Sequence, residues 1–165
     1  MTRVDPPRTA RTTTSAETTA ALASGLARKA RPGDLLCLWG DLGAGKTAFA
    51  KGFGAGLGVE GTVSSPSFIL MAEYRGRLPL FHIDLYRLHD ALDVLAGGLL
   101  DERQAEGVTL VEWPERMGSA LPEERLDVRI EGSGDEPRRI TFVAHGAAAA
   151  GYVRALDASV ASARR

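Results

Sequence analysis

The chain alternates short, almost wholly apolar runs with longer stretches in which apolar residues recur at helical spacing. Three apolar runs lack helical spacing and predict buried strands, at residues 34–39, 78–84 and 108–112. Helices are predicted at residues 15–30, where apolar positions recur every four residues among alanines, and at the alanine-rich residues 147–163. Strands that alternate with helices predict an α/β fold in three layers, with a mainly parallel central sheet and flanking helices.

The pattern changes towards the C-terminal end, where apolar and polar residues alternate. Residues 126–130 and 139–143 follow this alternation and enclose a turn at 132–135, which predicts an antiparallel hairpin. Residues 1–13 contain two prolines and several Thr and Arg residues, and predict a loose N-terminal arm in which a short edge strand can form. Because no linker is long enough to divide the chain, residues 1–165 are expected to form a single domain.

Less regular segments complete the predicted order of elements. A strand is expected at residues 68–72 and a broadly helical segment at 85–100. Residues 14–17 read Thr-Ser-Ala-Glu and predict a capping box at the start of the first helix. A second helix, which follows from Ala48 onward, is expected to end near Leu57, with Gly58 as its C-terminal cap.

A glycine-rich segment lies between the first buried strand and the second helix. It matches G-x-x-x-x-G-K-[ST], the pattern of phosphate-binding loops, and its position between strand and helix predicts a P-loop NTPase-like fold. Glycines let such a loop turn tightly, so that its N–H groups converge on a polyphosphate at the positive end of the helix. Lys46 is expected to reach the β- and γ-phosphates, and the Thr47 hydroxyl to bind a phosphate-bound Mg²⁺. We call this segment the glycine loop and expect nucleotide contacts from all its residues: Gly40, Asp41, Leu42, Gly43, Ala44, Gly45, Lys46 and Thr47.

Two acidic residues end apolar strands and are candidates for the metal site. Asp84 and Glu112 occupy these positions, and the carboxyl ends of parallel strands share the edge of the sheet where ligands bind. One carboxylate could hold the Mg²⁺ shell while the other orients the attacking water. His82 lies two residues before Asp84 and points to the same side of the strand, where a hydrogen-bonded structural role is favoured over that of a general base.

Composition narrows the class of protein. The 165 residues are 44% hydrophobic and carry a net charge of −1, which gives no bulk indication of a nucleic-acid or membrane partner. Cys37 is the single cysteine and can form no internal disulfide. No apolar run reaches the length of a membrane span, so a cytoplasmic location without membrane contact is expected. A GTPase is disfavoured because the sequence lacks an Asn-Lys-x-Asp guanine signature.

Several segments occur together in the order and spacing of one known family. They are the glycine loop, Ser-Pro-Ser-Phe at 65–68, Phe-His-Ile-Asp-Leu-Tyr-Arg-Leu at 81–88 and Leu-Val-Glu-Trp-Pro at 110–114. In these segments the chain resembles the TsaE (YjeE) family, the small bacterial ATPases of tRNA threonylcarbamoyladenosine synthesis. The likeness runs from the first helix to about Pro122, and the third and fourth segments together are much more specific to this family than the phosphate loop is.

The resemblance implies an ATPase that binds ATP and Mg²⁺ and is weak alone. Its partners would be the TsaB and TsaD proteins, a pair in which TsaD transfers a threonylcarbamoyl group to the adenosine next to the tRNA anticodon. The chain would meet tRNA indirectly, through that complex. By motif, Lys46, Asp84 and Glu112 would be catalytic, and Thr47 and Glu112 would bind the metal.

The same resemblance adds three nucleotide contacts outside the glycine loop. Asp84 would act at the nucleotide–metal site, and Thr18 in the first helix would approach the nucleotide. Ser67 stands where the family usually has Thr, in a switch-like segment, and retains the hydroxyl.

Two other functions remain open at this point. A small-molecule P-loop kinase would need an acceptor pocket and an arginine-bearing lid, and Arg87, Arg116 and Arg125 are the candidate phosphate contacts. A nucleotide-dependent assembly module would use ATP as a signal, with hydrolysis incidental to its role.

Overall fold

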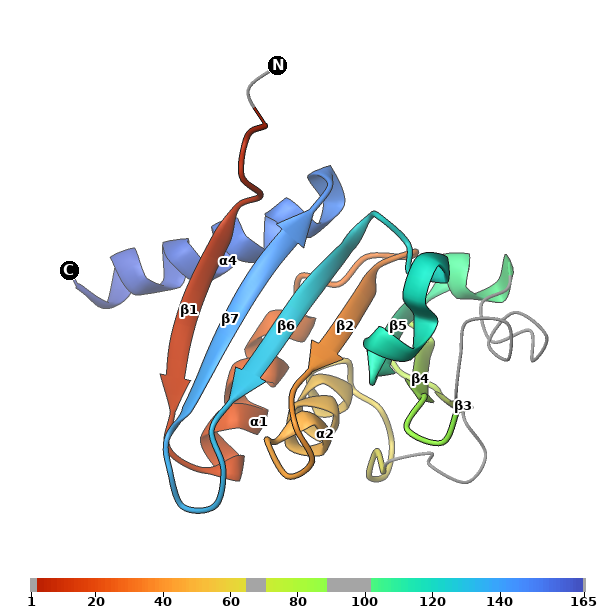
Figure 1. Ribbon diagram of the computed structural model, residues 1–165, viewed down its shortest axis with the longest axis horizontal. Helices are drawn as coiled ribbons and strands as arrows, with labels where there is room; N and C mark the ends of the chain where they lie inside the picture. Colours follow the sequence, from red (N-terminus) through yellow and green to blue (C-terminus); the bar gives the residue numbers. More distant parts are fainter. Residues whose placement is uncertain (1–2, 65–70, 89–101, 165) are drawn as a thin grey trace.

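Seven strands lie side by side in one sheet, in the order β1-β7-β6-β2-β5-β4-β3 (Figure 1). The computed structural model describes residues 3–64, 71–88 and 102–164. The strands are β1 (Arg8–Thr13), β2 (Leu35–Trp39), β3 (Met71–Tyr74), β4 (Leu80–Asp84), β5 (Val108–Glu112), β6 (Arg125–Glu131) and β7 (Arg138–His145).

Strand direction divides the sheet into a parallel centre and antiparallel margins. Strands β6, β2, β5 and β4 run parallel to one another, whereas β3, β7 and β1 pair antiparallel with the strands beside them. The expectation of a mainly parallel sheet therefore holds for the centre, and the sheet as a whole is mixed. The four parallel strands end at one edge, and β1 ends there too because two antiparallel pairings restore its direction. This edge, which we call the carboxyl edge, also holds the turn from β6 into β7.

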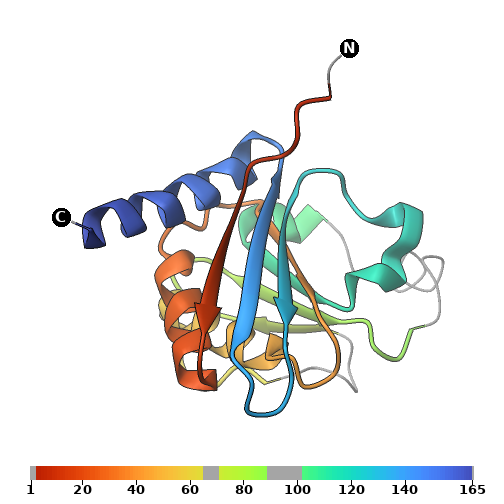
Figure 2. The ribbon, with the colours of Figure 1, turned by 60° about the vertical axis from the view of Figure 1, so that its left-hand side comes forward.

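The α-helices of the described residues all lie on one face of the sheet (Figures 1 and 2). They are α1 (Ala16–Ala27), α2 (Lys46–Gly56) and α4 (Ala147–Ala163). Together with the inward residues of the central strands they enclose the larger hydrophobic core, which includes Phe49, Phe53 and Phe142. Across the described residues no helix is both long enough and apolar enough to cross a membrane.

The opposite face has a different cover, so within the described residues the predicted three layers form only in part. Of the described residues, 3₁₀ segment η2 (Pro114–Ala120) packs on this face, where Met117 joins a small cluster with Cys37 and Val111. A second 3₁₀ segment, η1 (Glu102–Glu106), leads into β5.

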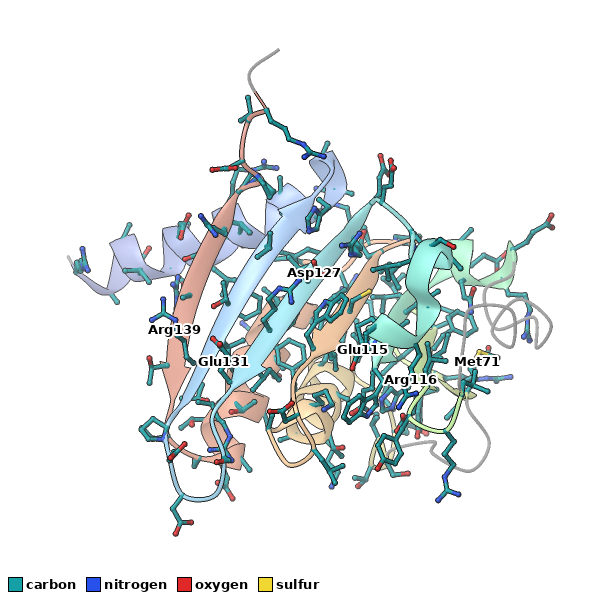
Figure 3. The ribbon with its side chains drawn as sticks, viewed as in Figure 1. Met71, Glu115, Arg116, Asp127, Glu131 and Arg139 are labelled. Carbon is teal, nitrogen blue, oxygen red and sulfur yellow. The ribbon has the colours of Figure 1, made fainter. Side chains whose placement is uncertain are left out.

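Over β6 and β7 this same face presents polar residues, with Asp127, Glu131 and Arg139 turned away from the helices (Figure 3). Asp127 is 1% exposed and accepts hydrogen bonds from the Trp39 indole (2.8 Å), from Arg125 (2.9 Å) and from the His145 ring (2.9 Å). The buried carboxylate thus has several donors, as burial of a charge requires. It also fixes Trp39, the residue directly before the glycine loop.

Helices α1 and α2 run parallel in close contact. A Cβ atom on Gly52 would lie 2.1 Å from the Ala20 carbonyl oxygen, and one on Gly56 would lie 2.3 Å from the Ser24 oxygen. Glycine is therefore required at both positions for the two backbones to approach this closely. Because the contact pairs run in the same order along both helices, the amino ends of α1 and α2 lie at the same end of the helix pair.

Helix ends differ from the prediction in small ways that have local causes. The capping box is displaced by one residue from the predicted one: Ser15 is the N-cap and Thr18 takes the third helical position. Helix α1 ends at Ala27 rather than Ala30, because i→i+3 hydrogen bonds replace the α-helical ones in the turn before Pro32. Predictions for α2 and α4 are confirmed, with Gly58 in a left-handed conformation after α2.

Other expectations require correction or cannot be compared. The N-terminal arm is not loose over Arg8–Thr13, since β1 pairs with β7 along six residues. The strand expected at 68–72 lies partly outside the described residues, and β3 occupies Met71–Tyr74. The predicted helix at 85–100 falls mostly outside them, and its described part, residues 85–88, is a turn.

Candidate active site

The glycine loop connects β2 to α2 at the carboxyl edge, as predicted. Its glycines carry positive φ angles of 155° at Gly40, 81° at Gly43 and 117° at Gly45, conformations that other residues rarely adopt. A Cβ atom on Gly40 would lie 2.7 Å from the Ile130 carbonyl oxygen at the end of β6. Helix α2 begins at Lys46, so the loop lies at the positive end of the helix dipole.

Lys46 is folded back onto its own loop. Its Nζ donates to the carbonyl oxygens of Gly40 and Asp41, the latter at 2.9 Å, and lies 4.1 Å from the centre of the Trp113 ring. Burial lowers the pKa of Lys46, and the negative charges of nearby carboxylates, Glu112 foremost, oppose that shift. The ammonium group therefore sits among acceptors that a bound anion would replace.

The two predicted acids are neighbours in the sheet. Asp84 and Glu112 pair directly in the parallel register of β4 and β5, and both are nearly buried. The His82 ring approaches Glu112 with 2.7 Å between Nε2 and Oε2, so the favoured structural role of His82 agrees with its contact. Asp84 accepts a hydrogen bond from the Tyr86 backbone N–H at 2.9 Å.

A pocket of about 350 Å³ joins the glycine loop to these acids. Thr47, Asp84 and Glu112 line it together with Lys46, so the residues predicted to bind phosphate and metal share one cavity. Arg87 also lines this pocket, whereas Arg125 donates a hydrogen bond to Asp127 on the sheet face that is turned away from the α-helices.

Trp113 shapes the wall of this pocket and has an unusual backbone. Among the described residues it alone, glycines aside, has a positive φ (60°). Its ring contacts Tyr86, with 5.0 Å between ring centres, as well as the Lys46 ammonium. A non-glycine residue held in this region is strained, and such strain is common at functional sites.

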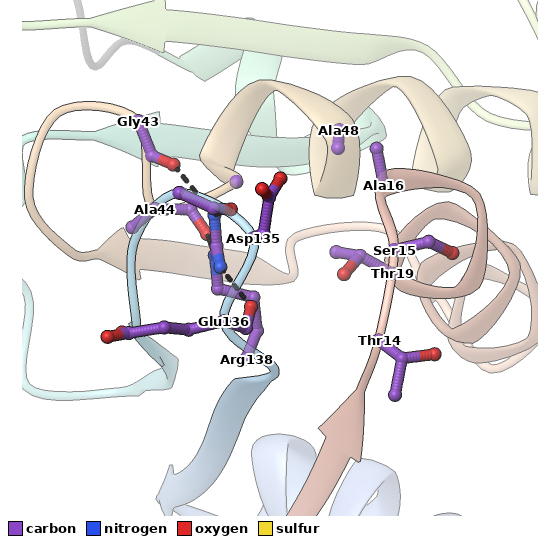
Figure 4. A pocket seen from close by; sticks show the side chains of 12 residues that line it. Thr14, Ser15, Ala16, Thr19, Gly43, Ala44, Ala48, Asp135, Glu136 and Arg138 are labelled. Carbon is purple, nitrogen blue, oxygen red and sulfur yellow. Dashed lines mark hydrogen bonds between the residues drawn. The ribbon is translucent and has the colours of Figure 1, made fainter.

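A second pocket, of about 500 Å³, lies on the other side of the glycine loop (Figure 4). The amino end of α1, the glycine loop and the β6–β7 turn enclose it. Its lining residues are Thr14, Ser15, Ala16, Thr19, Gly43, Ala44, Gly45, Ala48, Gly134, Asp135, Glu136 and Arg138. Gly43 and Gly45 line both pockets, so the two cavities meet at the loop.

The sequence did not indicate the residues of the second pocket that lie outside the glycine loop. Thr18, the predicted contact, does not line it, because its hydroxyl completes the capping box by accepting a hydrogen bond from the Ser15 backbone N–H at 3.0 Å. Thr19 and Arg138 do line it, and no motif marks either position. Ser67 lies outside the described residues.

Comparison with known proteins places this geometry in a family. The family model described as "Threonylcarbamoyl adenosine biosynthesis protein TsaE" matches residues 13–140. The chain is 48% identical over 135 residues to the tRNA threonylcarbamoyladenosine biosynthesis protein TsaE of Bacillus subtilis, which covers 81% of this chain and 84% of that protein. It is 39% identical over 127 residues to the TsaE protein of Treponema pallidum, covering 77% and 94% of the two chains.

A solved structure agrees with these sequence matches. The crystal structure of Bacillus subtilis YdiB superposes with a TM-score of 0.75 at 39% identity, over 94% of this chain and 95% of that one. The family match includes the glycine loop, both acids and the β6–β7 turn. The chain therefore belongs to the TsaE family of threonylcarbamoyl adenosine biosynthesis proteins.

Proposed function

We propose that the chain is a Mg²⁺-dependent ATPase with a P-loop NTPase fold that supports threonylcarbamoyl transfer to tRNA. The observation that carries the proposal is the shared pocket of Lys46, Thr47, Asp84 and Glu112 beneath the glycine loop. Membership of the TsaE family supports the tRNA pathway.

The phosphates of ATP would bind over the amino end of α2. There the N–H groups at the start of the helix have no partner within the helix, and the dipole favours negative charge. Lys46 would leave the carbonyl oxygens of Gly40 and Asp41 and turn to the β- and γ-phosphates, exchanging neutral acceptors for charged ones.

The donor atoms near the proposed γ-phosphate fit Mg²⁺. A hydroxyl on Thr47 and carboxylates on Asp84 and Glu112 are oxygen ligands, which this hard cation prefers, alongside water and phosphate. We propose that Thr47 and Glu112 hold the ion and that Asp84 orients the attacking water. The ion would neutralise charge that develops on the transferred phosphoryl group. His82 would keep the Glu112 carboxylate in one orientation through the 2.7 Å contact.

The nucleoside would occupy the second pocket, because that cavity begins where the phosphates would end. Gly43 and Gly45 belong to both cavities, and the hydroxyls of Thr14 and Ser15 with the Asp135 carboxylate offer polar partners for base and ribose. Thr18 would reach the nucleotide only by leaving its capping box, and Ser67 stays a prediction.

Partners would complete the mouth of the first pocket. Leu42 is 74% exposed and Tyr86 45% exposed, and both line that pocket. Large apolar side chains exposed at an active site favour a surface that another protein covers. We propose that TsaB and TsaD are these partners, that tRNA is met through their complex, and that the work is cytoplasmic.

The test is phosphate release from ATP with Mg²⁺, by the chain alone and with added TsaB and TsaD. Hydrolysis is expected to be slow alone and to rise with the pair. Lys46→Ala and Glu112→Gln should each reduce the rate about a hundredfold or more, because the first removes a cation that stabilises the transition state and the second weakens a proposed ligand of the Mg²⁺ that does so. Lys51→Ala is the matched control, since Lys51 lies exposed on the same helix.

The outcomes separate the candidates. No response to TsaB and TsaD would break the link to tRNA modification, and normal hydrolysis by Lys46→Ala would place ATP elsewhere. An assembly module would instead show ATP-dependent binding of TsaB and TsaD that Glu112→Gln leaves intact, together with normal tRNA modification by that variant.

A further inference from the structure

We infer that Arg138 is a positioning residue that holds the glycine loop in the shape that receives nucleotide. The inference rests on the proposed function, since it concerns how the same site is prepared. Arg138 begins β7 and lies 94 residues beyond Ala44 in the sequence. No motif of the chain includes it, and its role follows from four hydrogen bonds.

One guanidinium group connects two separate segments. Arg138 Nε donates to the Ala44 carbonyl oxygen at 2.8 Å, and one terminal nitrogen reaches the Gly43 oxygen at 3.4 Å. The same nitrogen donates to the Gly134 oxygen at 3.0 Å, and the other donates to the Glu136 oxygen. Figure 4 shows the side chain between the glycine loop and the β6–β7 turn. The loop is thereby tied to the turn.

These bonds determine how a key peptide group of the loop faces. In a trans peptide the C=O and N–H point in opposite directions. With the Ala44 oxygen held by Arg138, the N–H of Gly45 must point away from the guanidinium. A cation on the carbonyl oxygen also polarises that peptide and strengthens its N–H as a donor. We propose that this N–H, next to Lys46, is one of the donors to phosphate.

The turn is itself well fixed, so it can serve as an anchor. Glu136 N–H donates to the Ser133 carbonyl oxygen at 3.0 Å. Gly132 has a φ of 122°, and a Cβ atom added to it would lie only 2.7 Å from the Pro137 carbonyl oxygen. At its other end the loop touches the same hairpin, where Gly40 packs on the Ile130 carbonyl. The hairpin therefore contacts the loop at two points.

Arginine is suited to this task and lysine is not. The guanidinium has five N–H donors in a fixed planar fork, which lets one side chain bond several carbonyl oxygens at once. A lysine at this position would keep the charge but lose the fork.

The experiment compares Arg138→Met, Arg138→Lys and the control Arg139→Met. Arg139 is exposed and, as the next residue of the strand, points to the opposite face. Amide hydrogen exchange over residues 41–45 is measured without nucleotide, followed by the Kd for ATP and the kcat and KM of hydrolysis. Thermal unfolding of each variant identifies any general loss of structure.

Arg138→Met is expected to exchange the loop amides about tenfold faster and to raise the Kd and KM for ATP by a similar factor, because charge-assisted hydrogen bonds are lost. The kcat should change less, since the lost contacts prepare the site rather than touch the reacting atoms. Arg138→Lys should fall between, and Arg139→Met should match the parent chain.

Unchanged loop exchange and unchanged Kd in both Arg138 variants would overturn the inference. So would exchange that rises equally across the whole sheet, because Arg138 would then serve general stability. If Arg138→Met does not fold, Arg138→Lys decides by the same measurements. If the parent chain binds no ATP, the proposed function fails, and exchange without nucleotide still decides whether Arg138 holds the loop.

Discussion

The Lys46 ammonium contacts carbonyl oxygens in this structure and would contact phosphates in the proposed complex. The difference between these two environments determines how ATP affinity depends on pH. In the structure its ammonium group bonds two carbonyl oxygens of its own loop and faces the Trp113 ring. Burial lowers its pKa below the ordinary lysine value of 10.5. Bound phosphates would add negative charge beside the ammonium and raise the pKa again. In the proposed site, nucleotide binding and protonation of Lys46 would therefore be coupled.

ATP affinity is accordingly expected to fall at alkaline pH. Because the bound-state pKa would lie above the free-state pKa, the affinity is fully present below the free-state value and is lost as the pH rises from there through the bound-state value. Calorimetric titration between pH 8 and the ordinary lysine pKa of 10.5 measures this window, in which the phosphates of ATP stay fully ionised.

The control is Lys46→Arg, whose guanidinium stays protonated throughout. If Lys46→Arg binds ATP, its ATP affinity should not fall at alkaline pH. A decline of equal size in the variant and the parent would assign the effect to another group.

At the residue scale, the sequence revealed the parts of the site that local patterns encode. The glycine loop, Asp84 and Glu112 were predicted because a strand followed by a loop or an acid is visible within a few residues. Arg138 could not be found this way, since the Ala44 oxygen that it bonds in the glycine loop lies 94 residues away and arginines are numerous. Thr18 was a reasonable candidate, yet the one-residue shift of the capping box turns its hydroxyl to Ser15.

Among the elements, α1 and α2 form the tightest unit. Their backbones touch at Gly52 and Gly56, which brings the amino ends of two helices to the same pocket wall. In the sequence these glycines are only weak helix formers. The structure explains why alanine cannot replace them, because an added Cβ atom would overlap the backbone of α1.

Gly52→Ala is expected to destabilise the fold by roughly 2 kcal/mol or more, because the added methyl would overlap the Ala20 backbone. Gly25→Ala in α1 is the matched control, since nothing lies within 4 Å of its added Cβ. It should gain up to about 1 kcal/mol from better helix propensity. Urea unfolding of the two variants measures both values, and equal stabilities would contradict the close helix contact.

The order and type of most elements followed from periodicity, whereas pairing did not. Strands β2, β4 and β5 are buried on both faces, and their apolar runs identified them. Antiparallel β1 lies in a segment that was predicted as a loose arm in which a short edge strand can form, because its threonines and arginines give no apolar pattern. The pairing with β7 that makes it a strand is visible only in the structure. Because the strands at the margins of the sheet pair antiparallel, they make the sheet as a whole mixed.

For the molecule as a whole, Cys37 offers a probe of global opening. It lies in β2 at the middle of the sheet and is fully buried, and burial raises the pKa of its thiol to about 12. At neutral pH the thiol is therefore protonated and shielded, and the thiolate is the reactive form.

Thiol labelling of the native chain should thus be slow and should follow the rate or population of global unfolding in urea. Cys37 is the single cysteine of the chain, so the signal has one source. Adding an exposed thiol with Ala163→Cys gives the fast control. Rapid labelling of Cys37 in the native parent would show that β2 opens locally.

The order of the strands in the sheet also has a consequence for folding during synthesis on the ribosome. The glycine loop is synthesised early, but β2 lies between β5 and β6, and the second pocket is closed by Thr14 and Arg138 from distant parts of the chain. A nascent chain that has exposed only its first half therefore holds the phosphate motif without the neighbouring strands that support it. Since such long-range contacts form late, the proposed nucleotide site would be complete only in the last steps of folding, and ATP could stabilise the chain only then.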